Sequence, residues 1–155
     1  MFISRKDFNF GFSFVEIIIV LAIISSLSAI VVLSFSKVGG VQSLEKTTIS
    51  VISILNEAKS MAVSSKDYSD YGVRVENNKL ISFKGNYGNE NKIYNIPNLV
   101  EISDISIDGV TNNDVIFKKV SGSTNATGTI TISVVDNLTV NNSIKISTTG
   151  LIEKI

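Results

Sequence analysis

A single carboxylate, Glu16, lies inside the most apolar stretch of the chain. Residues 12–33 contain no other charged side chain, and apolar residues follow Glu16 without a break from Ile17 to Ile24. A carboxylate at the centre of a membrane-spanning helix costs roughly 2.5–3.5 kcal/mol, and less near the helix end. No lysine or arginine occurs between Phe12 and Ser36, so a cation that pairs with Glu16 must come from a freed N-terminus or from another molecule.

Gly11 comes directly before the apolar stretch, and Phe12 opens it. A secretory signal instead carries the small residue of its cleavage site after the apolar run. The leader before Gly11 contains Arg5 and Lys6, which the positive-inside rule places in the cytoplasm. Cleavage after Gly11 frees an ammonium on Phe12, about one helical turn from Glu16.

This order of residues resembles the N-terminal signature of the type IV pilins and type II secretion pseudopilins. The resemblance implies that a prepilin peptidase cuts between Gly11 and Phe12 and methylates the new N-terminal Phe12. Glu16 is then the assembly residue, because pairing with the Phe12 amine of a neighbouring chain selects one docking position. The alternative is a plain membrane anchor in which Glu16 lies at the membrane interface by chance.

The apolar stretch divides the chain into three expected parts. Residues 12–33 make a helix of about 33 Å, which is long enough to cross a hydrocarbon core. We therefore expect a leader at 1–11, a transmembrane and filament-core helix at 12–36, and a globular domain outside the cytoplasm at 37–155. The expected location is the bacterial inner membrane, and a filament or pseudopilus after assembly.

Composition argues against catalysis and metal binding. The chain has no cysteine and no histidine, which removes disulfides, histidine-based triads and histidine-ligated zinc. Asp104, Asp108 and Asp114 are potential oxygen ligands for calcium, but they lack EF-hand spacing and are typical of turns. We predict no catalytic residues, no metal and no cofactor, and we do not expect an enzyme.

Charge gives no general attraction to nucleic acid. The chain has 14 basic and 14 acidic side chains, and loss of Arg5, Lys6 and Asp7 with the leader leaves 12 and 13. Basic residues near the C-terminus are sparse, namely Lys145 and Lys154. Nucleic acid is therefore not expected as a partner.

The helical pattern continues beyond the apolar stretch. Gly39-Gly40 is expected to interrupt the helix, because each glycine costs about 1 kcal/mol in a helix interior. An amphipathic helix is predicted at about 41–64. Its apolar stripe falls at alternating spacings of three and four residues: Val41, Leu44, Thr48, Val51, Leu55, Ala58 and Ala62.

Residues 70–155 are predicted to be rich in β-strands. A hairpin turns at Asn77-Asn78, and further turns are expected at Asp136-Asn137, Asn141-Asn142 and Thr149-Gly150. The predicted class is α+β: a long N-terminal helix, half membrane-spanning and half amphipathic, packed against a C-terminal antiparallel sheet as in pilins. The run of short strands after Gly128 also resembles the H-type minor pseudopilins and related minor pilins.

The sequence therefore predicts a structural subunit of a type IV pilus-like filament or a type II secretion pseudopilus. Expected partners are other pilin or pseudopilin subunits, the prepilin peptidase, the inner-membrane assembly platform and membrane lipid. The alternative is a membrane-anchored binding domain that captures DNA or a secreted substrate through loops at 85–91 and 121–128.

Overall fold

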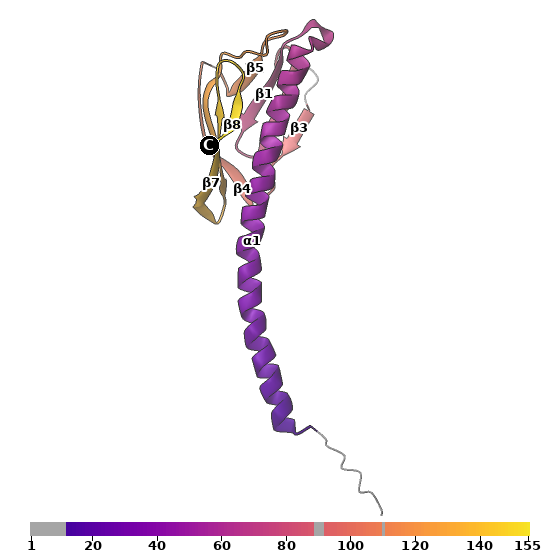
Figure 1. Cartoon of the computed structure of the whole chain (residues 1–155), viewed down its shortest axis with the longest axis vertical. Helices are drawn as coiled ribbons and strands as arrows, with labels where there is room; N and C mark the ends of the chain where they lie inside the picture. The colour runs from indigo at the N-terminus through magenta and orange to yellow at the C-terminus, as the bar shows by residue number, and fades with distance from the viewer. Residues whose placement is uncertain (1–11, 89–91, 110) are drawn as a thin grey trace, which may run out of the picture. The chain divides into compact units, whose positions relative to one another are not determined.

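The computed structural model of this chain describes residues 12–88, 92–109 and 111–155, with only the backbone of residues 30–38. The predicted leader, including the cleavage residue Gly11, lies outside the described residues. The chain divides into two compact units, residues 1–37 and residues 38–155. Helix α1 (Phe14–Val63) begins in the first unit and ends in the second, and all strands belong to the second (Figure 1).

The part of α1 in the second unit buries one face. Six of the seven side chains in the predicted apolar stripe are buried, and Val41 is the exception at 52% exposed. Lys46, Ser50 and Glu57, on the other side of the helix, are exposed. The spacing of three and four residues places the stripe on one side of the helix, which explains this division.

The two glycines at 39 and 40 do not interrupt α1, so the expected break is wrong. A side-chain carbon added to Gly40 would lie 3.0 Å from a methyl group of Val134, whereas one added to Gly39 would meet nothing within 4 Å. Gly40 therefore lets the end of a strand approach the helix closely. Packing outweighs the low helix propensity of glycine here.

The C-terminal end of α1 is capped from a distant loop. The backbone N–H of Val120 donates to the carbonyl of Ala62 at 3.0 Å. Ser65 then takes a left-handed conformation, with φ of 51°, and a single turn of 3-10 helix, η1 (Lys66–Tyr68), follows. The carbonyl of Ala62 also accepts from the Ser65 N–H at 2.9 Å, so the bond from Val120 ties the distant loop to the end of the helix.

The first sheet has the strand order β3-β2-β1-β5. Its strands are β1 (Tyr71–Glu76), β2 (Lys79–Lys84), β3 (Lys92–Asn95) and β5 (Asp114–Phe117). The β1–β2 hairpin turns at Asn77-Asn78, where the sequence predicts it. The strand β5 returns from far along the chain to pair with β1.

The second sheet has the strand order β4-β6-β7-β8. Its strands are β4 (Val100–Asp108), β6 (Thr127–Val134), β7 (Asn137–Ile146) and β8 (Ile152–Lys154). The predicted turn at Asn141-Asn142 is wrong, because both residues pair with β6 inside β7. The amide of Asn142 donates to Thr48 Oγ1 at 3.1 Å, so α1 satisfies this polar side chain within the strand.

The predicted fold class is wrong. The strands form two four-stranded antiparallel sheets rather than one sheet, and α1 begins at Phe14 and is followed by a second helical element, η1. Within the described ranges, no helix combines the length and apolar character needed to cross a membrane. Alternation along the chain identifies strands, but it does not reveal which of them pair across long separations.

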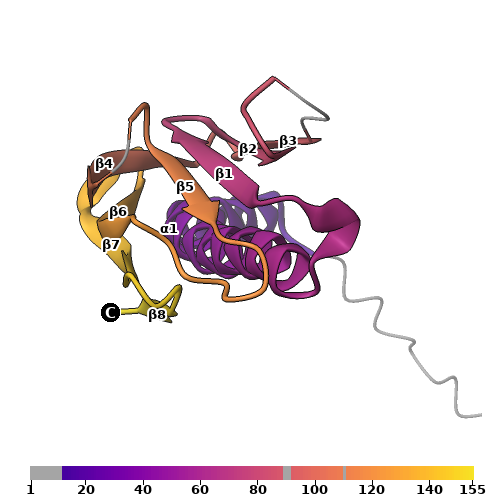
Figure 2. The same ribbon diagram turned by 90° about the horizontal axis from the view of Figure 1, so that it is seen from above.

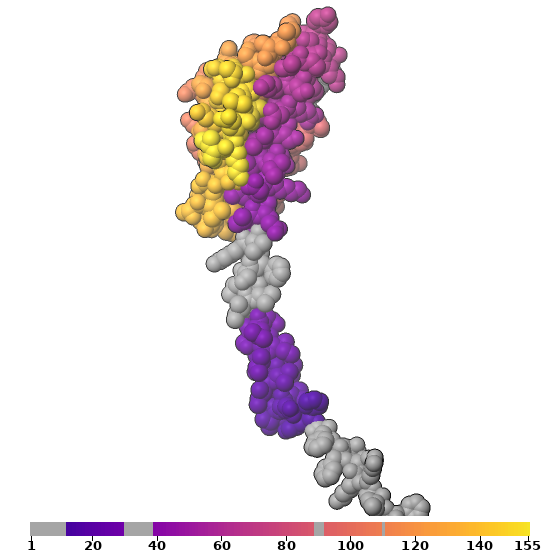
Figure 3. Space-filling view, viewed as in Figure 1, coloured from indigo at the N-terminus to yellow at the C-terminus, as the bar shows by residue number. Residues whose placement is uncertain are grey.

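One hydrophobic core joins the two sheets and α1 within residues 38–155. In the view along the helix, the strands form an arc around it, with β3 at one end and β8 at the other (Figure 2). The largest fully buried side chains come from α1 and both sheets: Leu55, Leu80, Phe117, Ile130, Ile132, Ile144 and Ile146. In the space-filling view, the C-terminal residues lie against the helix (Figure 3).

Candidate functional site

The start of α1 exposes large apolar side chains on all its sides. Those from Phe12 to Leu27 are between 48% and 80% exposed: Phe12, Phe14, Val15, Ile17, Ile18, Ile19, Val20, Leu21, Ile23, Ile24 and Leu27. A helix that is apolar all round is normally buried. Contact of this segment with another apolar surface would therefore be favourable.

Glu16 is the only charged residue of this segment, and it is exposed. It lines a shallow hollow on the helix surface together with Phe12, Ile17, Val20 and Leu21. The structure thus places Phe12 and Glu16, the two predicted site residues in the described ranges, at one surface. The third, Gly11, lies outside those ranges.

Three serine hydroxyl groups near the end of this segment donate to carbonyls of the helix. Ser25 Oγ donates to the carbonyl of Leu21 at 2.7 Å, and Ser28 Oγ donates to that of Ile24 at 2.8 Å. Serines bonded in this way leave no free donor and fit an apolar environment. Burial of these serines therefore carries little polar cost.

In the loop at 85–91, one of the two proposed ligand-binding loops, the aromatic residue Tyr87 contacts another part of the fold. The ring of Tyr87 covers the Arg74 guanidinium at 3.5 Å. Arg74 also makes a bidentate ion pair with Asp114, at 2.6 and 2.7 Å, which raises the pKa of the guanidinium. These contacts join β1, β5 and the loop, and they occupy the guanidinium group of Arg74.

The second proposed loop, at 121–128, is also held by internal contacts. Ser121 and Ser123 share a hydrogen bond of 2.9 Å between their hydroxyl groups, and Thr124 and Ala126 are buried. Thr124 and Asn125 of this loop line a cavity of about 210 Å³ together with Gly109, Asp114 and Lys118.

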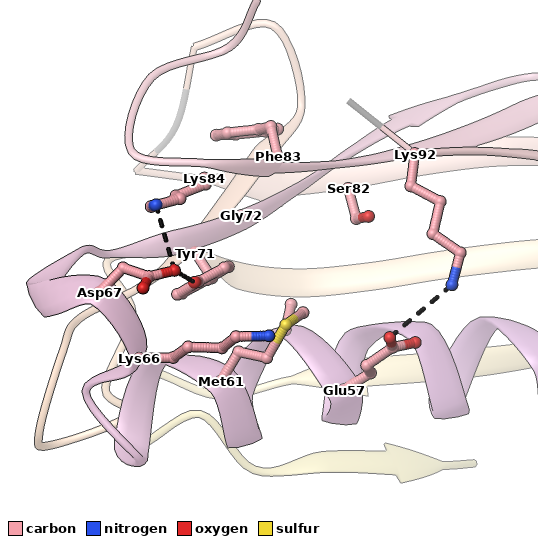
Figure 4. A pocket seen from close by; sticks show the side chains of 11 residues that line it. Glu57, Met61, Lys66, Asp67, Tyr71, Gly72, Ser82, Phe83, Lys84 and Lys92 are labelled. Carbon is pink, nitrogen blue, oxygen red and sulfur yellow. Dashed lines mark hydrogen bonds and ion pairs between the residues drawn. The ribbon is translucent and has the colours of Figure 1, made fainter. Parts of the chain in front are cut away.

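A cavity of about 190 Å³ lies between α1 and the first sheet (Figure 4). Lys84 and the Tyr71 hydroxyl both contact the carboxylate of Asp67, at 3.1 and 3.3 Å, and this lowers the pKa of Asp67. Lys92 lies 3.8 Å from Glu57 across the opening. Charges of both signs therefore line the cavity, and four of them form these two ion pairs.

The acidic residues considered for calcium are not assembled into a site. Asp114 pairs with Arg74, and no group of three potential ligands occurs among the described residues. The basic residues near the C-terminus are also dispersed, because Lys154 pairs with Glu45 at 2.6 Å on α1.

No protein-family model, curated protein or solved structure matches this chain.

Asp70 provides a test of the loop packing at the end of α1. It accepts a hydrogen bond from the Lys119 backbone N–H at 2.8 Å, and Lys118 Nζ lies 3.3 Å from its other oxygen. The Lys119 N–H, and then the Lys118 ammonium, hold the pKa of Asp70 below its ordinary 3.8. A lowered folded-state pKa stabilises the fold above about pH 4, and this contribution is lost as the pH falls through the folded-state pKa.

We therefore expect Asp70→Asn to lower the free energy of unfolding by about 1 kcal/mol at pH 7. The difference from the wild type should shrink as the pH falls from about 4 through the lowered folded-state pKa, below which the carboxylate is protonated in both states. Urea unfolding of residues 38–155, at pH 7 and at acidic pH, measures this difference in the free energy of unfolding. A difference that is constant across that range would contradict the role of the Asp70 charge.

Proposed function

We propose that this chain is a structural subunit of a type IV pilus-like filament or a type II secretion pseudopilus. It assembles through the apolar segment of α1 around Glu16. The observation that carries the proposal is the exposure of this segment on every side, with one carboxylate and no basic side chain from Phe12 to Ser36. Packing against the same segment of neighbouring subunits covers the apolar surface.

The size of the driving force supports assembly. Full burial of a large aliphatic or aromatic side chain contributes about 1.5–3 kcal/mol. The exposed side chains between Phe12 and Leu27 therefore provide a large favourable free energy when subunits pack together. Such a surface gives affinity but little choice of register, and the single charge of Glu16 supplies that choice.

The remaining partners follow from this proposal. A prepilin peptidase removes residues 1–11 and methylates Phe12, and an inner-membrane assembly platform adds the subunit to the filament. The bacterial inner membrane and its lipid hold the subunit before assembly. The binding alternative has less support, because Arg74, Tyr87 and Ser121 are engaged within the fold.

Processing and fractionation test the proposal together. In cells with an active prepilin peptidase, intact-mass measurement should show a chain that lacks residues 1–11 and carries one added methyl group on Phe12. The same species should be present in filaments sheared from the cells. Gly11→Leu, which puts a bulky side chain at the cut, should leave the full-length chain in the membrane fraction. A full-length wild-type chain absent from every sheared fraction would contradict the proposal.

A further inference from the structure

The strand β3 is an edge of the first sheet and β8 is an edge of the second, and the unpaired backbone groups of these two edges are complementary. In the first sheet, the N–H of Ile96 donates to the carbonyl of Asn78. Hydrogen-bonded pairs alternate along an antiparallel ladder, so the backbone groups of Tyr94 and Lys92 also bond to β2. The backbone groups of Ile93 and Asn95 therefore point away from the sheet. No hydrogen bond within the described residues uses them.

The alternation of hydrogen-bonded pairs also shows which backbone groups of β8 point outward. The N–H of Ile155 donates to the carbonyl of Ser143, and the N–H of Ser147 donates to that of Leu151. Glu153 therefore bonds to β7, and the backbone groups of Ile152 and Lys154 point outward. These groups also have no partner among the described residues.

The two edges run in the same direction at the same level of α1. Along β3, Lys92 lies beside Glu57, and the following residues line a cavity with Lys46. Along the final segment, the carbonyl of Gly150 accepts from Lys59, and Lys154 reaches Glu45. Both strands therefore run antiparallel to α1 and parallel to each other, at opposite ends of the arc of strands (Figure 2).

Lysines on an edge strand usually discourage pairing. Here the two edge lysines lean toward α1 and are neutralised by its carboxylates, Lys92 by Glu57 at 3.8 Å and Lys154 by Glu45 at 2.6 Å. Ile93, which is 57% exposed, and Glu153 lie on the opposite face of their strands. The outward backbone groups are therefore not screened by free charges.

We propose that β8 of one copy adds to the β3 edge of a second copy as a parallel strand. The inference rests on the proposed function and names a second copy of this chain as its partner. With Ile93 aligned with Glu153, the Ile93 N–H donates to the Ile152 carbonyl and the Lys154 N–H donates to the Ile93 carbonyl. The Asn95 N–H then donates to the Lys154 carbonyl.

This alignment determines on which face of the joined sheet the side chains and the helices of the two copies lie. Ile93 and Glu153 both point away from their own helices, and aligned residues of a parallel pair project to the same face of a sheet. The α1 segments of the two copies therefore lie on one side of the joined sheet. A shift by two residues, which aligns Asn95 with Glu153, preserves this arrangement, whereas a shift by one residue reverses it.

The contact uses different surfaces of the two copies. After one contact has formed, one copy still offers a free β3 and the other still offers a free β8. Such a head-to-tail interface continues through further copies and produces a ring or a helical array. A filament requires a contact of this kind.

Cross-linking tests the inference, because the chain has no cysteine of its own. The full chain carrying Ile93→Cys with Glu153→Cys, or Asn95→Cys with Glu153→Cys, is expressed in filament-forming cells and mildly oxidised. Neighbouring strands lie about 4.8 Å apart, within the range that a disulfide spans. At least one pair should give a ladder of dimers and larger species on a non-reducing gel.

The matched control is Lys92→Cys with Glu153→Cys. Lys92 is exposed and adjacent to Ile93, but it projects to the other face of the joined sheet. This variant should form at least tenfold less cross-linked product. In the pair that contains Ile93→Cys, Asn95→Pro removes an outward N–H without touching the β2 ladder and should reduce cross-linking several-fold, whereas Asn95→Ala should not.

The outcomes separate this inference from the proposed function. Monomers alone from both test pairs overturn the inference, and so does equal cross-linking of the Lys92→Cys control. Presence of the monomeric chain in sheared filaments then leaves the proposed function standing. Cross-linked ladders from a chain absent from sheared filaments support the strand pairing and contradict the filament role.

Discussion

Replacement of Glu16 by alanine or glutamine should leave membrane insertion and leader cleavage largely intact but lower the incorporation of the chain into filaments about tenfold or more. The measurement is the fraction of the chain in sheared filaments, at equal expression and relative to the wild type. Glu16→Asp should be intermediate, because its side chain is one methylene shorter.

The expected effect follows from the cost of a charge in apolar surroundings. A carboxylate between packed apolar helices costs several kcal/mol unless a cation pairs with it. In the proposed filament, the Phe12 ammonium of a neighbouring subunit relieves that cost only in one alignment of the two helices. Loss of the pair removes the preference for that alignment, and about 1.4 kcal/mol of lost preference corresponds to a tenfold effect.

Ser25→Ala is the matched control for this experiment. Its hydroxyl donates to the carbonyl of Leu21 inside the same helix turn, so its loss removes no contact to a neighbour. Incorporation of this variant should equal that of the wild type. Normal incorporation of Glu16→Ala would remove the role proposed for Glu16 and weaken the filament proposal itself.

Gly128→Ala should destabilise the globular unit by about 3 kcal/mol or more. Gly128 has a φ of 151°, a conformation that side chains with a Cβ rarely adopt. An added Cβ would overlap the carbonyl oxygen of Ser106 and approach the Cα of Ile107 at 2.9 Å. Both contacts are with the backbone of the paired strand β4, so relief requires the β4–β6 ladder to separate.

Guanidinium chloride unfolding of residues 38–155 measures this effect. Gly39→Ala is the control, because nothing lies within 4 Å of the added carbon and alanine favours a helix by roughly 0.5–1 kcal/mol. It should leave stability unchanged or slightly higher. A Gly128→Ala variant as stable as the wild type would show that the β4–β6 packing differs from the one described.

Local patterns in the sequence predicted individual elements well. The alternation around Asn77-Asn78 gave a hairpin whose residues pair one to one in the structure. The spacing of three and four residues identified Leu44, Val51 and Leu55, all of which are buried. These features depend on neighbours along the chain, where side-chain periodicity is visible.

Pairing between distant segments was not predictable in this way. Nothing in the local pattern indicates that β5 returns to β1 while β4 pairs with β6, and this division produces two sheets. Gly40 continues a helix because Val134 packs against it, and Asn142 lies within a strand because Thr48 accepts its amide. In each case a contact from elsewhere in the fold overrode the local preference.

The candidate residues also divide into those that the sequence indicated and those that only the fold reveals. Glu16 stood out in the sequence as a lone charge in an apolar run, and the structure places it and Phe12 at one surface. The open edges at Ile93 and Lys154 were not anticipated, because a strand edge exists only after the order of strands is known. Alternation along β3 or β8 gives no sign of which strand is last.

The contacts that hold α1 against the second sheet also set a delay during synthesis. Lys59, Thr48 and Glu45 find partners 91, 94 and 109 residues further along the chain. At about 5–20 residues per second, roughly 5–20 s separate the synthesis of the helix from that of its cover. For those seconds the side of the nascent helix that packs against the second sheet has no cover from the chain itself.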